Sequence, residues 1–198
     1  MVSQFLRVIR HTPKLLCVIL LSVPMLNGCT LLVAGGAVGA TKVAMDGRDV
    51  GTQVDDTSLR LRIQNQLREH ERLAEQRILV VPYDGNVLVF GQASGQARKD
   101  EAIRLIRNIE GVNRVYDELR VGEPVSFAQR SRDSLLTSRV KVALLAQRDF
   151  DHTNISVYSE ANEVFLVGRT SRAAATNAIE TARNINGVER VIDAIDKQ

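Results

Sequence analysis

The sequence predicts an α+β protein made of two tandem modules, each in the order helix, strand, strand, helix, strand. Three observations lead to this fold class. Residues 108–115 (NIEGVNRV) recur as residues 184–191 (NINGVERV), and farther upstream Gly91 matches Gly168. Within each copy, helical and strand periodicities follow one another in the same order. An apolar stripe on each of two helices is best buried when both lie on one face of a three-stranded sheet.

Residues 1–28 are predicted to be a lipoprotein signal peptide. Three basic residues and no acidic ones precede a mostly apolar run at 15–26, which is shorter than the roughly 20 residues that a membrane-spanning helix needs. The run ends in the letters LNGC, which resemble a lipobox, so Cys29 is the predicted lipidation site. The alternative is an uncleaved anchor that also uses the apolar stretch 31–40. Pro24 and the glycines disfavour such a continuous helix.

Loss of the leader changes the charge and the cysteine content of the chain. The full sequence has 26 basic and 23 acidic residues, and removing the three basic residues of the leader leaves 23 of each. Nucleic-acid binders need a basic surplus to neutralise phosphates, so no nucleic-acid partner is expected. With Cys17 removed and Cys29 acylated, no thiol remains for a disulfide, a metal site or catalysis. Residues 29–56 are the predicted lipidated tether.

The first module is predicted over 57–121. Its first helix follows Asp56 as the N-cap, and its two hairpin strands flank a turn at Asp84-Gly85. Gly91 ends the second strand, where a bulge or a close backbone approach is expected, and Gly111 is the predicted C-cap of the second helix. The apolar positions of the two helices are Leu59, Ile63 and Leu67, then Ala102, Ile103, Ile106 and Ile109.

The second module is predicted over 134–198, after a linker at 122–133. Asp133 is the expected N-cap, residues 160–162 form the hairpin turn, and Gly187 takes the place of the C-cap glycine. The apolar helix positions are Leu136, Val140 and Leu144, then Ala178, Ile179, Ala182 and Ile185. Because modules of about 65 residues are only marginally stable alone, the two are expected to pack against each other.

The paired modules, with Gly91 and Gly168 and the repeated motif Asn-Ile-x-Gly-Val-x-Arg-Val, resemble the BON domain. Together with the lipobox and the stretch 50–56 (VGTQVDD), they are similar to the dual-BON outer-membrane lipoproteins of Gram-negative bacteria, the division- and outer-membrane-stress-associated lipid-binding family. The resemblance implies a non-catalytic protein, anchored on the periplasmic side of the outer membrane. It implies binding of anionic phospholipid, mainly through the second module, and support of outer-membrane integrity.

The repeat indicates which surface would contact lipid. On the outer face of the second module's first helix, three apolar residues replace Ser58, Asn65 and Arg68 of the first copy. Apolar residues beside cations suit shallow insertion among anionic headgroups. The alternative is that these apolar residues pack against the first module or add to the core of their own module. Members of the family can present a large aromatic residue near the start of this helix, where Leu135 is the apolar residue in this chain. The predicted phospholipid-binding residues are Leu135, Arg139, Lys141, Val142, Leu145 and Arg148.

Other chemistry is not expected. His70 and His152 have no second histidine or thiolate nearby in the sequence to complete a metal site, and no Ser/His/Asp grouping is visible. The sequence therefore predicts no enzyme, cofactor, metal or small-molecule substrate. The main alternative function is a protein–protein adaptor for envelope assembly or cell-wall remodelling machinery. Its candidate surface on the second helix consists of Arg98, Lys99, Arg104 and Arg107.

Overall fold

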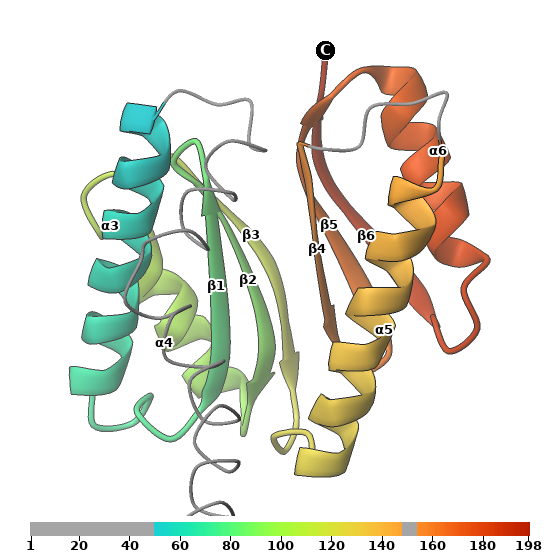
Figure 1. Ribbon diagram of the computed structural model, residues 1–198. Coiled ribbons are helices and arrows are strands. Elements are labelled where there is room, and N and C mark those ends of the chain that lie inside the picture. Colours follow the sequence, from blue (N-terminus) through green and yellow to red (C-terminus); the bar gives the residue numbers. More distant parts are fainter. Residues whose placement is uncertain (1–49, 148–153) are drawn as a thin grey trace, which may run out of the picture. The chain divides into compact units, whose positions relative to one another are not determined.

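The computed structural model of the chain describes residues 50–147 and 154–198 (Figure 1). The predicted α+β class and element order are confirmed in both copies. The first module consists of α3 (Val50–Glu69), β1 (Arg77–Tyr83), β2 (Asn86–Ala93), α4 (Gln96–Arg107) and β3 (Arg114–Val121). The second consists of α5 (Phe127–Leu145), β4 (Ile155–Glu160), β5 (Glu163–Thr170), α6 (Arg172–Arg183) and β6 (Arg190–Lys197).

Each sheet has its hairpin-connected strands antiparallel and its last strand parallel to the middle one. The strand orders are β1-β2-β3 and β4-β5-β6. Both hairpins turn through two residues with positive φ, Asp84 (52°) and Gly85 (73°) in the first and Ala161 (52°) and Asn162 (62°) in the second. Two consecutive left-handed residues match the twist of the flanking strands, which explains the tight turns.

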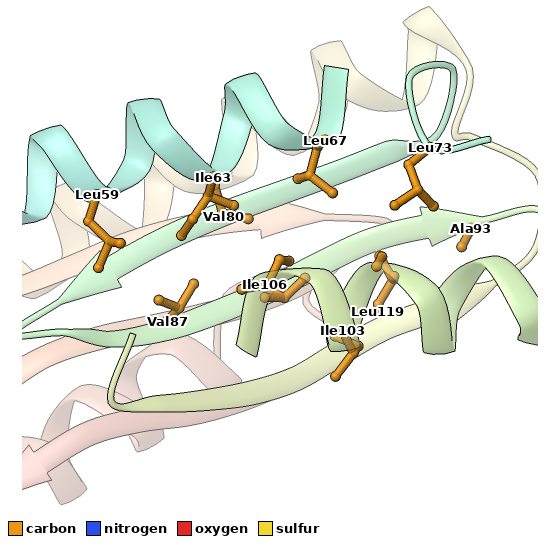
Figure 2. Close-up of a cluster of buried hydrophobic side chains, with 12 residues drawn as sticks. Leu59, Ile63, Leu67, Leu73, Val80, Val87, Ala93, Ile103, Ile106 and Leu119 are labelled. Atoms are coloured by element: carbon orange, nitrogen blue, oxygen red, sulfur yellow. The ribbon is translucent and has the colours of Figure 1, made fainter. Parts of the chain in front are cut away.

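The two helices of each module cover the same face of its sheet, as Figure 1 shows for α3 and α4 against β1–β3. In the first module, Leu59 and Ile63 of α3 and Ile106 of α4 meet Val80 and Val87 of the strands (Figure 2). The second module repeats this core with Leu136, Val140, Leu144, Val157, Val164, Leu166, Ala175, Ala178, Ala182 and Ile195. The predicted apolar stripes are therefore the buried ones.

The other faces of the two sheets share a third hydrophobic cluster. Phe90 of β2 stacks on Phe165 of β5, with ring centroids 4.3 Å apart, and Val81, Leu88 and Val167 pack around them. Both modules belong to one compact unit, Met45–Gln198. The middle strands are continuously apolar because one face of each packs on helices and the other on this shared cluster.

Gly91 and Gly168 stand where the backbone of a neighbouring strand comes closest. A Cβ atom at Gly91 would lie 2.1 Å from the Arg77 carbonyl oxygen, and one at Gly168 would lie 2.0 Å from that of Asn154. The predicted close backbone approach is confirmed at both positions, since no side chain fits there.

The predicted N-caps are wrong. Asp56 and Asp133 lie inside α3 and α5, because both helices begin earlier, at Val50 and at Phe127. Residues 50–56 of the predicted tether and 127–133 of the predicted linker are therefore helical. The two aspartates are buried, and each accepts backbone hydrogen bonds from the hairpin turn of its own module. Their spacing in the repeat reflects this tertiary contact, not a helix start.

The glycines assigned as C-caps also have another role. α4 ends with Asn108 as its C-cap and α6 with Asn184, so Gly111 and Gly187 lie three residues farther along. Both adopt positive φ, 92° and 98°, in the turn that leads into the last strand. Glycine is favoured there because other residues rarely adopt that conformation.

Candidate functional site

The first helix of the second module, α5, begins at a well-formed cap. The Ser126 side-chain oxygen accepts a hydrogen bond from the Gln129 backbone N–H at 3.2 Å. A serine followed three residues later by glutamine is a common signature of a helix start. The cap makes Phe127 the first residue of α5. Phe127 therefore lies in the N-terminal part of the helix, residues 127–133, which the sequence analysis assigned to the linker.

The rotation of α5 about its axis is fixed by a buried stripe and one carboxylate. Leu136, Val140 and Leu144 enter the core. Asp133 is 2% exposed and accepts hydrogen bonds from the backbone N–H groups of Ala161 (2.9 Å) and Asn162 (3.0 Å) at the hairpin turn. With one side held against the sheet and the turn, the opposite side of the helix faces outward.

The outward side of α5 carries large apolar residues. Leu135 is 60% exposed, Val142 68%, Leu145 71% and Phe127 76%. When each residue turns the helix by about 100°, these four fall within an arc of about 80°. We call these four residues the apolar face of α5. The alternative of packing against the first module does not apply, because the three predicted side chains are open to solvent.

Basic residues flank the apolar face. The predicted Arg139 and Lys141 are exposed on opposite sides of it, and the structure adds Arg130 and Arg132. The Arg130 guanidinium lies 5.9 Å from the centroid of the Phe127 ring. Within residues 50–147 and 154–198, no carboxylate forms an ion pair with any of these four cations. Arg148, the sixth predicted residue, lies outside the described residues.

Three serines on α5 are already hydrogen-bonded within the helix. The hydroxyls of Ser131, Ser134 and Ser138 donate to the carbonyl oxygens four residues earlier, at 3.1, 3.0 and 3.1 Å. A hydroxyl whose donor is satisfied costs less to remove from water. Ser131 and Ser138, within the arc of the apolar face, and Ser134 beside it therefore do not prevent its transfer to a less polar environment.

The matching surface of α3 is different. At the positions of Leu135, Val142 and Leu145 it has Ser58, Asn65 and Arg68, and the last two are joined by a hydrogen bond. One apolar residue, Leu61, is 53% exposed there. The two helices contribute equivalent stripes to their cores, so the difference between the modules lies in the outward residues.

Phe127 is the site residue that the sequence analysis missed. Phe127 is an exposed aromatic residue at the start of α5, eight residues before Leu135, the residue that the sequence analysis placed near the helix start. The signal was the Ser126-x-x-Gln129 capping pattern, which marks the helix start without any knowledge of tertiary contacts.

The histidines and carboxylates of the described residues do not cluster as metal ligands do. In that part of the chain no group of three His, Cys, Asp or Glu side chains is placed to hold a metal ion. His70 is half-buried, with Nε2 3.4 Å from Glu101 Oε1, and His152 lies outside the described residues. No helix in the same ranges is both long enough and apolar enough to cross a bilayer.

Comparison with known families gives the class of protein that this fold represents. The BON domain family matches residues 55–123 and again residues 132–196, one match for each module. The chain belongs to the BON domain family, and the predicted resemblance is confirmed.

Similarity to individual proteins is more specific. The chain is 41% identical to the outer membrane lipoprotein DolP of Haemophilus influenzae over 180 residues, 90% of this chain and 93% of the relative. It is 42% identical to the 21 kDa hemolysin of Actinobacillus pleuropneumoniae, over 77% of this chain and 79% of that protein. It is 27% identical to the osmotically-inducible protein Y of Escherichia coli, over 76% of each chain.

These relatives bear on location and on general role. The match to DolP covers nearly the whole of both chains, and it identifies a lipid-anchored protein of the outer membrane with an envelope-related role. The predicted localisation is thereby confirmed. None of the three relatives is named as an enzyme. Cys29, the predicted acylated residue, lies outside the described residues, and its lipidation stays a prediction.

Proposed function

We propose that this lipoprotein is non-catalytic, is anchored on the periplasmic side of the outer membrane through Cys29, and binds anionic phospholipid through the apolar face of α5. The observation that carries the proposal is the exposure of the apolar face, whose four residues are each at least 60% open to solvent. The cations that flank this face form no ion pair with a carboxylate of the described residues. Exposed apolar groups flanked by basic residues are typical of helices that lie in a membrane interface.

The expected energies suit reversible binding. A Val, Leu or Phe side chain contributes roughly 1.5–3 kcal/mol when fully buried, and shallow insertion gives a fraction of that. Each basic residue near an anionic surface contributes about 1 kcal/mol. The helix lies parallel to the surface in this arrangement, because its apolar residues run along its whole length and not at one end.

Lipid binding has a purpose even in a chain that is already anchored. Acyl chains contribute about 0.8 kcal/mol for each buried methylene group, so they hold the protein at the membrane without help. The anchor also raises the local concentration of headgroups near α5, which makes a weak site effective. The α5 face would then determine where on the membrane the protein gathers and thereby support envelope integrity. Gathering at the division site is a further part of the proposal, and it rests on the family resemblance.

The second candidate function is that of an adaptor for envelope assembly or cell-wall machinery. Arg98, Arg104 and Arg107 of α4 are exposed, and no carboxylate in the described ranges pairs with them. Lys99 does not belong to this surface, because its ammonium group donates to the Leu119 carbonyl oxygen at 2.6 Å and pairs with Asp117 at 3.2 Å. An envelope protein with an acidic surface would fit the three arginines.

Vesicle flotation tests the lipid-binding proposal. Residues 45–198 hold all three hydrophobic clusters and can be studied without the anchor. We expect this unit to float with vesicles that contain phosphatidylglycerol and not with pure phosphatidylcholine. L135E/V142E/L145E should abolish flotation, because three carboxylates replace the inserting side chains and are repelled by the headgroups.

The matched control places the same three carboxylates on α3. L61E/N65E/R68E changes exposed residues on the equivalent face of the first module and should float like the wild type. The lipid-binding proposal is wrong if the folded L135E/V142E/L145E protein still floats, or if both triple variants lose flotation equally. The mass of the mature protein tests the anchor separately, by showing whether cleavage and acylation occur at Cys29.

A further inference from the structure

A groove of about 510 Å³ lies between α3 and α5, over the edge strands β1 and β4. Its walls include Arg60 and Gln64 from α3 and Arg130 from α5, and its floor includes Leu79, Phe90 and Tyr158. The groove lies within the compact unit Met45–Gln198. It is distinct from the apolar face of α5, none of whose four residues lines it.

The acceptors on the groove wall are already occupied. Both carboxylate oxygens of Glu160 accept hydrogen bonds from Arg77, at 2.7 and 2.8 Å. This pairing raises the pKa of the Arg77 guanidinium, and its effect exceeds the opposing effect of burial. Asp133 accepts from Gln129 Nε2 and from two backbone N–H groups of the hairpin turn. The acidic groups of the groove therefore have little capacity left for a cationic ligand.

The donors are not all occupied. Arg60 Nε is buried and has no hydrogen-bond partner among the described residues. In the same ranges, neither Arg60 nor Arg130 forms an ion pair with a carboxylate. A guanidinium presents five N–H donors in a planar fork that matches a carboxylate or a phosphate. A groove with spare arginine donors and saturated acceptors has the chemistry to bind an oxyanion.

The floor indicates the rest of the ligand. Leu79 and the ring of Tyr158, both half-buried, provide apolar surface on the floor, which the almost fully buried Val81 and Phe90 also line. Sites for small ligands commonly have volumes of about 300–1,000 Å³ and combine such a surface with a few convergent polar groups. An inorganic anion would leave the apolar floor uncovered, whereas a neutral amphiphile would leave the arginines unpaired.

We propose that this groove binds a single-chain amphipathic anion, with its carboxylate or phosphate group between Arg60 and Arg130 and its alkyl chain on the apolar floor. A free fatty acid and a phospholipid that has lost one acyl chain both have this chemistry. The groove is thus a second site, which takes one released molecule, while the α5 face contacts an intact bilayer.

Calorimetric titration of residues 45–198 tests the proposal with probes below their critical micelle concentrations. Laurate represents the free fatty acid, and dodecyl phosphate represents the phospholipid that has lost one acyl chain. Two control probes each lack one feature: dodecyl maltoside has no charge, and inorganic phosphate has no alkyl chain. We expect one dodecyl phosphate or laurate per protein, bound at least tenfold more tightly than either control probe. The tighter of the two anionic probes identifies the source.

Variants locate the site. R60Q/R130Q should weaken the binding of the anionic probe at least tenfold, and Q64W, which narrows the groove without removing a charge, should also weaken it. R98Q/R104Q removes two arginines from α4 instead and should bind like the wild type, as should L135E/V142E/L145E, which tests the bilayer proposal separately. Circular dichroism confirms that each variant is folded.

Three results would overturn the inference. The first is dodecyl phosphate binding no more tightly than dodecyl maltoside or inorganic phosphate. The second is unchanged binding in both the folded R60Q/R130Q and Q64W proteins. The third is loss of probe binding in L135E/V142E/L145E together with full binding in R60Q/R130Q, which would assign the probe to the apolar face of α5.

Discussion

Replacing Asp133 by alanine should destabilise the second module far more than its position in the middle of a helix suggests. The carboxylate accepts three hydrogen bonds, from the backbone of Ala161 (2.9 Å) and Asn162 (3.0 Å) and from Gln129 Nε2 (3.0 Å). A hydrogen bond to a charged group contributes about 1.5–3 kcal/mol. The turn residues Ala161 and Asn162 are only half-buried, so in the variant water would replace part of the lost hydrogen bonding. We therefore expect a net loss of about 3 kcal/mol, well below the sum of the three bonds.

Urea denaturation of residues 45–198 measures this loss. With a denaturant dependence of about 2 kcal/mol per M, a loss of about 3 kcal/mol lowers the midpoint by about 1.5 M. D133N keeps one acceptor oxygen but loses the charge, and it should lie between D133A and the wild type. D56A removes the equivalent contact of the first module, with Asp84 N–H at 2.9 Å and Gly85 N–H at 3.2 Å, and should behave like D133A.

The matched control is D55A, which removes an exposed aspartate next to the buried one in α3. Alanine is the better helix former, and surface changes usually alter stability by less than about 0.5 kcal/mol, so D55A should leave the midpoint unchanged or raise it slightly. If D133A lowers the free energy of unfolding no more than D55A does, the Asp133 carboxylate does not stabilise the hairpin turn and the assigned role is wrong.

Three further variants address the contact between the sheets and the membrane face. E160A leaves Arg77 without its partner in a site where Glu160 is 3% exposed, and it should lower the free energy of unfolding, measured in urea, by about 2–3 kcal/mol. R169A removes two surface ion pairs, with Asp84 and with Asp196, and should lower it by only about 1 kcal/mol. Equal losses would contradict this ranking. F127A should leave stability unchanged because the ring is 76% exposed, and it should weaken vesicle binding roughly fivefold, equivalent to about 1 kcal/mol. Unchanged vesicle binding would remove Phe127 from the lipid-contact face.

The parts of the fold that follow from local sequence were predictable. The apolar positions Leu136, Val140 and Leu144 are spaced for one face of a helix, and they are buried as a stripe. Asp84-Gly85 is a favoured pair for a two-residue hairpin turn, and the chain turns there with both φ angles positive. In each case the residues that determine the structure lie within a few positions of one another.

The roles that depend on distant residues were not predictable. Asp133 bonds a turn that lies 28 and 29 positions farther along the chain, and nothing adjacent in the sequence distinguishes that role from a helix cap. The stacking of Phe90 on Phe165 joins two modules, and its sequence signal is indirect. The apolar runs 87–90 and 164–167 have no polar alternation, which indicates strands covered on both faces.

The duplication accounts for how one module gained a candidate binding face without a change of fold. In each module one face of the sheet is covered by its helices and the other by the shared cluster around Phe90 and Phe165, so the sheets are open to a ligand only at the groove over the edge strands β1 and β4 among the described residues. The outward sides of the first helices, α3 and α5, are left. A residue there contributes nothing to the core, so it can change from polar to apolar at little cost in stability. Three such differences, at Leu135, Val142 and Leu145, are enough to separate α5 from α3, whereas a new face on a sheet would require both cores to be rebuilt.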